Sequence, residues 1–128
     1  MGTPDMRIPI SFVLAYPDRI SNSVKKLELG KVKELTFFEP DLDKFPCLEL
    51  AYESLKIKKS APTILNAANE VAVDAFLSNK IKYLSIPKLV EKTLNKASFS
   101  NINSIKDVIE IDNDSRQFTA SMVVSGKY

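Results

Sequence analysis

Apolar residues recur at helical spacing throughout the second half of the chain. From residue 45 onward the sequence is strongly helical, and Pro46 stands in a first turn, where its missing N–H is harmless. The apolar positions that follow the i, i+3, i+4, i+7 rule, and are expected to face inward, are Leu48, Ala51, Tyr52 and Leu55. The pattern predicts an amphipathic helix in this stretch.

Two further helices are expected, each preceded by a serine suited to an N-cap. Ser60 is expected to cap a second helix, which runs to about Asn79. Ser85 is expected to cap a third helix. The inward positions of that third helix are Ile86, Leu89, Val90, Thr93, Leu94 and Ala97.

The end of the chain predicts a turn and a last helix. Ser104 is expected to cap a short turn, and a helix then starts at Asp112 or Asn113. The apolar positions of the turn are Ile105, Val108 and Ile109, and those of the helix are Phe118 and Met122. Short polar connections between successive helices favour antiparallel packing. Residues 45–128 are therefore predicted to form a small four-helix bundle.

Residues 1–16 contain one more helix candidate, which we interpret as the remnant of a preceding domain. Asp5 can cap it and Pro17 ends it. An apolar stripe runs along it, formed by Met6, Ile10, Val13, Leu14 and Pro17. A helix this short is marginal in isolation, so the stripe needs something to pack against.

Residues 17–44 show no helical period. They contain one plausible strand, around Leu35–Phe38, and then a Pro-Asp turn. A stretch this long without its own core is expected to be an extended arm that lies across another surface. A disordered linker is the alternative, although the segment is more apolar than a solvated linker needs. The predicted fold is mainly α: a four-helix bundle preceded by a short helix and a long extended arm with at most one short strand.

The second helix of the bundle has two distinct faces. At 100° per residue one broad face is apolar and rich in alanine; it is formed by Ile64, Leu65, Ala68, Val71, Ala72, Ala75 and Phe76. The opposite face carries Asn66, Asn69 and Glu70, with the aliphatic Val73 and Leu77 beside them. Amides, an acid and two aliphatics together suit a wet contact with another domain. The alternative is that they are solvated surface residues, because scattered exposed apolar side chains are normal.

Composition narrows the partners and the compartment. The net charge of the 128 residues is only +2, with both signs mixed along the chain, so no nucleic-acid or membrane partner is expected. The single cysteine, Cys47, excludes an intrachain disulfide and fits the cytoplasm. No apolar run approaches the roughly 20 residues needed to span a bilayer.

Catalytic chemistry is largely missing from the sequence. There is no histidine, and the glycines stand only at 2, 30 and 126, so no phosphate-cradling loop can be written. The acidic run 112–115 fails the calcium-loop pattern at Arg116, and helix capping explains it better. Cys47 follows a helix-start proline, a position that can lower the pKa of a thiol and make it reactive. A buried structural cysteine is the better interpretation. We expect no metal site, and no reaction by this chain alone.

Three segments carry a family resemblance. Residues 2–20 hold a G-x-P-D-M-R-x-P-I opening, residues 35–55 an F/Y-P-C-L-x-L-A motif, and residues 61–77 an N-A-A-N-E motif. In this order they resemble the C-terminal part of the 1-deoxy-D-xylulose 5-phosphate reductoisomerases. The resemblance implies an NADPH- and divalent-metal-dependent (Mg or Mn) enzyme of the non-mevalonate isoprenoid pathway that makes 2-C-methyl-D-erythritol 4-phosphate. It also implies a C-terminal helical bundle after a long linker.

The resemblance places the glycine-rich NADPH fingerprint, the metal carboxylates and the phosphate-binding residues in sequence that this chain lacks. We therefore expect the chain to bind no cofactor itself. Only Pro4 and Met6 fall in the segment that borders the nicotinamide and substrate pocket in the family. For Met6 the alternative is ordinary helix packing.

Two functions from different classes remain open at this point. The first is an inactive C-terminal fragment of the reductoisomerase, a scaffold whose partner is the rest of its own enzyme, itself expected to be a homodimer. The second is a freestanding helical protein-interaction module derived from that family. In either case the apolar arm makes self-association plausible, including exchange of arms between copies.

Overall fold

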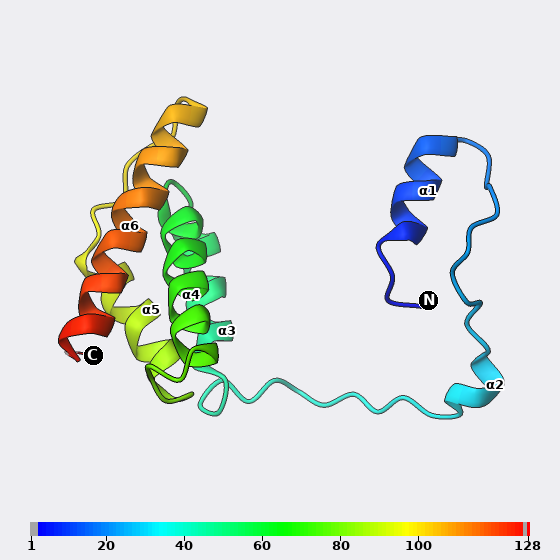
Figure 1. Cartoon of the computed structure of the whole chain (residues 1–128), viewed down its shortest axis with the longest axis horizontal. Coiled ribbons are helices and arrows are strands. Elements are labelled where there is room, and N and C mark those ends of the chain that lie inside the picture. The colour runs from blue at the N-terminus through cyan, green and yellow to red at the C-terminus, as the bar shows by residue number, and fades with distance from the viewer. Residues whose placement is uncertain (1–2, 127) are drawn as a thin grey trace. The chain divides into compact units, whose positions relative to one another are not determined.

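The computed structural model describes residues 3–126 and 128. It forms two compact units, Met1–Glu39 and Pro40–Tyr128. The described residues contain six helices and no strand, so the predicted mainly α class is confirmed (Figure 1). The predicted segment boundaries after residues 16 and 44 stay a prediction.

The first unit is a short helix with a return segment hydrogen-bonded to it. Helix α1 (Arg7–Ala15) has Met6, not the expected Asp5, at its N-cap position, although the Asp5 carboxylate accepts the backbone N–H of Arg7 at 2.9 Å. The return segment is held by the Arg7 guanidinium on Ser23 Oγ at 3.0 Å. It is also held by the Asn22 amide on Ser11 Oγ at 3.1 Å. No residue of α1 is buried, and its apolar stripe is exposed.

The arm contains a short helix rather than the expected strand. Helix α2 (Leu29–Val32) is a single turn, and no residue of the Leu35–Phe38 segment is in a strand, so that prediction was wrong. A strand is stable only when a neighbour completes its hydrogen-bond ladder. The described residues offer no second strand, and the side chains of Phe37 and Phe38 are 87% and 88% exposed.

The second unit is the predicted bundle of four helices. They are α3 (Pro46–Ile57), α4 (Ala61–Leu77), α5 (Ser85–Lys96) and α6 (Ile105–Ser125). Helix α4 is central, since it packs against each of the other three (Figure 1). Small side chains allow this: the fully buried alanines of α4 are Ala61, Ala67, Ala68 and Ala72. The side chains of Leu89 and Val90 of α5 are buried in the same core clusters as alanines of α4.

Helix α3 is rotated relative to the sequence expectation. Tyr52 and Leu55 were predicted inward, but their side chains are 54% and 62% exposed, so those two predictions were wrong. The side of α3 that meets the core carries Cys47, Leu50 and the buried Ser54. A small residue such as Ser54 permits the close approach to α4 that a tyrosine would prevent, so small volume outweighed the apolar period.

The last helix is continuous where two elements were expected. Helix α6 runs through Asp112 and Asn113, so neither starts a helix, and that prediction was wrong. No glycine or proline interrupts the segment, and Asp112 forms an ion pair at 2.6 Å with Arg116 one turn later. Ser104 does cap the helix: its Oγ accepts the N–H of Asp107, whose carboxylate accepts the N–H of Ser104 in return.

The other two expected caps take different forms. Ser60 occupies the N-cap position of α4, but its Oγ accepts the N–H of Ser100 at 3.1 Å instead of an α4 amide. Ser85 is the first residue of α5 and makes no cap bond, so it is not the cap. The bond from Ser100 to the Ser60 side chain ties the loop after α5 to the start of α4. Among the described residues, no helix is long and apolar enough to cross a membrane.

Candidate functional site

The turn that carries Pro4 and Met6 is held by its neighbours. The Asp5 N–H donates to the Thr3 carbonyl at 2.9 Å, and the Thr3 hydroxyl donates to the Lys25 carbonyl at 3.0 Å. Both bonds are made by the residues flanking Pro4. Pro4 and Met6 are themselves exposed, Met6 at 71%. The turn therefore presents these two side chains outward.

A carboxylate–guanidinium pair stabilises this turn. The Arg7 guanidinium donates to both carboxylate oxygens of Asp5, with Nη2 at 2.6 Å from Oδ2 and Nε at 3.0 Å from Oδ1. These hydrogen bonds hold the pKa of Asp5 at about 2. Asp5 and Arg7, the two charged residues of the opening motif, thus bond each other. The side chains of Pro4 and Met6 beside them face outward.

Asn66 and Glu70, two of the three polar residues expected on the outer face of α4, belong to a network within the bundle. The Asn66 amide donates to Glu70 Oε1 at 3.0 Å, and Arg116 of α6 donates to Glu70 Oε2 at 2.5 Å. These bonds lower the pKa of Glu70, the Arg116 bond most. Arg116 also holds Asp112, and its pKa is raised by both carboxylates. This network ties α4 to α6.

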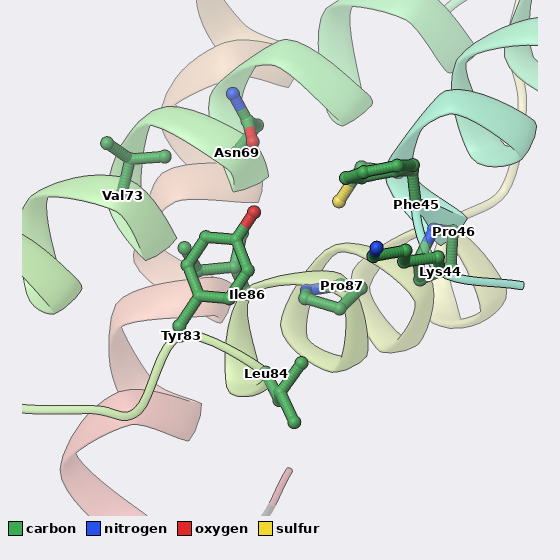
Figure 2. Close-up of a pocket in the computed structure, with 10 residues that line it drawn as sticks. Lys44, Phe45, Pro46, Asn69, Val73, Tyr83, Leu84, Ile86 and Pro87 are labelled. Atoms are coloured by element: carbon green, nitrogen blue, oxygen red, sulfur yellow. The ribbon is translucent and has the colours of Figure 1, made fainter. Parts of the chain in front are cut away.

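Asn69, the third, lies three residues from Asn66 on the same helix, and its surroundings differ. It is half-buried and lines a cavity of about 230 Å³ between the starts of α3 and α5. The other lining residues are Lys44, Phe45, Pro46, Cys47, Val73, Tyr83, Leu84, Ile86 and Pro87 (Figure 2). The wall is mostly apolar, and its polar groups include the Asn69 amide, the Lys44 ammonium and the Tyr83 hydroxyl. Asn69 therefore lines this cavity, whereas Asn66 and Glu70 belong to the network with Arg116.

Residues from two motifs meet at this cavity. Phe45, Pro46 and Cys47 belong to the F/Y-P-C-L-x-L-A stretch, and Asn69 belongs to N-A-A-N-E. Partial burial raises the pKa of the Cys47 thiol, so it is a neutral wall group near pH 7 rather than a nucleophile. Its expected structural role fits this position, although its side chain is only partly buried.

Sequence reasoning did not find Arg116, nor the cavity residues Tyr83 and Leu84, which stand just before α5. Arg116 was noticed only because it breaks a calcium-loop pattern, although Asp112 four residues earlier was a signal of a helical ion pair. Tyr83 and Leu84 carried no such signal, because only the packing of α5 on α4 brings them to Asn69. Among the residues that the structure describes, no three Asp, Glu, Cys or His side chains are grouped closely enough to hold a metal ion.

Comparison with known sequences gives a consistent family. A sequence profile described as the DXP reductoisomerase C-terminal domain matches residues 1–118. The 1-deoxy-D-xylulose 5-phosphate reductoisomerase of Trichlorobacter lovleyi is 50% identical over 112 residues, which are 88% of this chain and 29% of the relative. That of Geotalea daltonii is 47% identical over 125 residues, which are 98% of this chain and 33% of the relative.

Solved structures agree with the sequences. The reductoisomerase of Zymomonas mobilis in complex with NADPH matches with a TM-score of 0.86 and 43% identity, over 96% of this chain and 32% of that one. A DOX-P reductoisomerase structure with fosmidomycin and magnesium matches with a TM-score of 0.80 and 34% identity, over 96% and 33%. The chain thus spans about a third of the length of these relatives. It belongs to the C-terminal domain family of the 1-deoxy-D-xylulose 5-phosphate reductoisomerases.

Proposed function

We propose that this chain is a scaffold of the reductoisomerase and is inactive by itself. The whole enzyme converts 1-deoxy-D-xylulose 5-phosphate to 2-C-methyl-D-erythritol 4-phosphate with NADPH and a divalent metal ion. The observation that carries the proposal is the match of nearly the whole chain to about a third of each relative. The described residues supply no carboxylate cluster that fits the magnesium of the solved relatives, so no metal-dependent step is assigned to them.

An assay of NADPH oxidation tests this proposal. The chain alone, given 1-deoxy-D-xylulose 5-phosphate, NADPH and Mg²⁺, is expected to show no rate above the buffer blank. A chimera that joins it to the preceding two-thirds of the Geotalea daltonii relative is expected to be active. Turnover by the chain alone would overturn the proposal, and so would an inactive chimera that is folded and binds NADPH.

Pro4 and Met6 are proposed to border the nicotinamide and substrate pocket of the complete enzyme. Their support is the Asp5–Arg7 pair, which leaves both side chains outward on a hydrogen-bonded turn, and the NADPH complex of the Zymomonas mobilis relative. In the chimera, Met6→Ala is expected to raise the KM for NADPH more than Val13→Ala, an exposed change on the same helix. Equal KM values in the two variants would contradict the assignment.

The face of α4 with Asn66, Asn69 and Glu70 is proposed to contact the rest of the enzyme. Asn69 is the strongest candidate, because Asn66 and Glu70 already bond within the bundle. In the chimera, Asn69→Lys should lower the Tm and the activity more than Asn66→Lys. Variants that match the parent in both properties would contradict an interdomain role for this face.

Self-association is the second proposal, since two adjacent phenylalanines of the arm are almost fully exposed. We propose that the chain pairs with a second copy through its arm. The complete enzyme is separately proposed to be a homodimer and to be located in the cytoplasm. A freestanding interaction module would show the same pairing without the rest of the reductoisomerase. Analytical ultracentrifugation of the chain across a concentration series tests the pairing.

A further inference from the structure

The turn before α1 is tied to the segment that returns past the helix. Three side-chain hydrogen bonds of 3.0–3.1 Å join the two stretches within the first unit. They run from the Thr3 hydroxyl to the Lys25 carbonyl, from Arg7 Nη1 to Ser23 Oγ, and from the Asn22 amide to Ser11 Oγ. Positions 3, 7 and 11 are spaced by four, and their partners follow in the reverse order, 25, 23 and 22. The return segment, residues 22–25, therefore runs along one side of the turn and of α1.

The return segment is itself held in shape. Asn22 Oδ1 accepts the backbone N–H of Val24 at 3.0 Å, a local turn that asparagine favours. On the helix side, the Ser11 hydroxyl that accepts from Asn22 donates to the Ile8 carbonyl at 3.0 Å. The side chain of Val24 is half-buried, whereas its neighbours in residues 20–26 are exposed. These local bonds fix the hydroxyl and the carbonyl on which the turn is held.

Arg7 joins the turn to the return segment through one guanidinium. Its Nε and Nη2 donate to the Asp5 carboxylate at 3.0 and 2.6 Å, and its Nη1 donates to Ser23 Oγ at 3.0 Å. A guanidinium presents its donors in a rigid planar fork, so a single arginine holds two partners in fixed geometry, which a lysine does not. The carboxylate stays ionised because Arg7 holds the pKa of Asp5 at about 2. This chain of bonds brackets Met6.

Pro4 and Met6 alternate with the residues that make these bonds. The side chains of Thr3, Asp5 and Arg7 bond within the unit, and the two side chains between them are exposed. Because the charges of Asp5 and Arg7 neutralise each other, the turn presents two uncharged side chains. These fit the flat nicotinamide ring of NADPH better than its phosphates, since a thioether makes favourable contacts with aromatic rings. The turn thus suits the nicotinamide end of the cofactor.

We propose that Thr3, Arg7 and Ser23 are positioning residues of the NADPH site, which hold Pro4 and Met6 in the conformation that contacts the nicotinamide. The inference rests on the pocket role proposed above for Pro4 and Met6. A turn that is already in its binding conformation loses less entropy when the ligand binds, so affinity improves without a further contact. The return segment then belongs to the NADPH site, although it acts only through the turn.

Ser23→Ala in the chimera tests the bond to Arg7. Loss of this acceptor is expected to raise the Kd for NADPH about threefold and to leave kcat within about twofold. Ser23→Thr retains the hydroxyl and should restore the parent Kd. Ser21→Ala, just before the return segment and outside the bonds described above, is the matched control. Fluorescence titration with NADPH measures the Kd without turnover.

Arg7→Lys is expected to have a larger effect, because it removes the fork that holds both partners. The Kd for NADPH should rise about tenfold. Carboxyl NMR of the 128-residue chain should show that the pKa of Asp5 rises in this variant. A parent chain in which Asp5 titrates at the ordinary aspartate value would overturn the proposal, since Arg7 would then not hold the turn in solution.

A double variant distinguishes positioning from general destabilisation. If Ser23 acts through the turn, Met6→Ala/Ser23→Ala should raise the Kd by clearly less than the product of the two single effects. Effects that multiply would mean that Ser23 acts independently of Met6, which contradicts a positioning role. Circular dichroism verifies that the variants are folded, and parent-like binding by folded Ser23→Ala and Arg7→Lys chimeras would contradict that role equally.

Comparison with Met6→Ala separates this inference from the pocket role. If Met6→Ala binds NADPH no more weakly than Val13→Ala, the pocket role and this inference both fail. If Met6→Ala weakens binding but Ser23→Ala and Arg7→Lys do not, the pocket role stands and the return segment does not position the turn. The expected result is weaker binding in all three variants, with Val13→Ala and Ser21→Ala like the parent.

Discussion

The two units of this chain treat their apolar side chains in opposite ways. In the bundle, Leu89 and Val90 of α5 are fully buried in core clusters that include alanines of α4. In the first unit, neither α1 nor α2 buries a single residue, although α1 also carries an apolar stripe. The difference teaches that an amphipathic pattern records a need for a partner surface. The bundle contains that surface within itself, whereas the first unit does not.

The same truncation in the two units should give the largest contrast. Leu89→Ala removes a fully buried side chain from the core, and it is expected to lower the free energy of unfolding by about 2–5 kcal/mol. Leu14→Ala on α1 should change it by less than about 0.5 kcal/mol, because that side chain is exposed. Urea denaturation monitored by circular dichroism measures both. Similar losses would show that α1 shares the cooperative core.

Removing the cap of α6 should have an intermediate effect. Ser104→Ala loses the hydroxyl that accepts the Asp107 N–H at 3.2 Å and is expected to cost about 1 kcal/mol. Ser104→Asp retains an acceptor and is the conservative control. Thermal denaturation that shows no difference between the alanine and aspartate variants would mean that the first turn of α6 frays without affecting the bundle.

A smaller effect is expected from lysines in the left-handed region. Lys58, at the end of α3, has φ of 61°, and Lys33, at the end of α2, has φ of 60°. Glycine adopts such angles without steric cost, although it loses more chain entropy on folding. Lys58→Gly is therefore expected to stabilise the bundle by about 0.5 kcal/mol. Lys33→Gly should leave the main unfolding transition unchanged, and a shift of equal size would show that the arm unfolds with the bundle.

Acid should act on both units by small amounts and with the same sign. Glu70 has a lowered pKa in the folded bundle, so its bond to Arg116 contributes at neutral pH and is lost as the pH falls through that folded-state value. Asp5, held at about 2 by Arg7, retains its bond down to that pH. Carboxyl NMR titration reports each group separately. A Glu70 that titrates at or above the ordinary glutamate pKa would mean that the tie between α4 and α6 is not formed in solution.

The sequence predicted most of the bundle and less of its site. The sequence alone predicted Pro46 in a first turn, Ser104 as a cap and the alanines of α4 as a close-packing face. The first two act on neighbouring residues, and the alanines act through their small size. The face of α3 was not, because apolar residues lie on more than one side of it and only packing selects among them. The interdomain face of Asn66, Asn69 and Glu70 stays a prediction, and the chain alone did not show that Arg116, 50 residues beyond Asn66, bonds Glu70.

By itself, the sequence determined that the chain is mainly helical and which family it belongs to. These properties follow from residue spacing, capping and motif order, which act within a few neighbouring residues. The tertiary structure alone decided which side of α3 is buried and that Asn69 and Cys47 line one cavity. Such features depend on volumes and charges brought together from distant parts of the chain, and no local pattern encodes them.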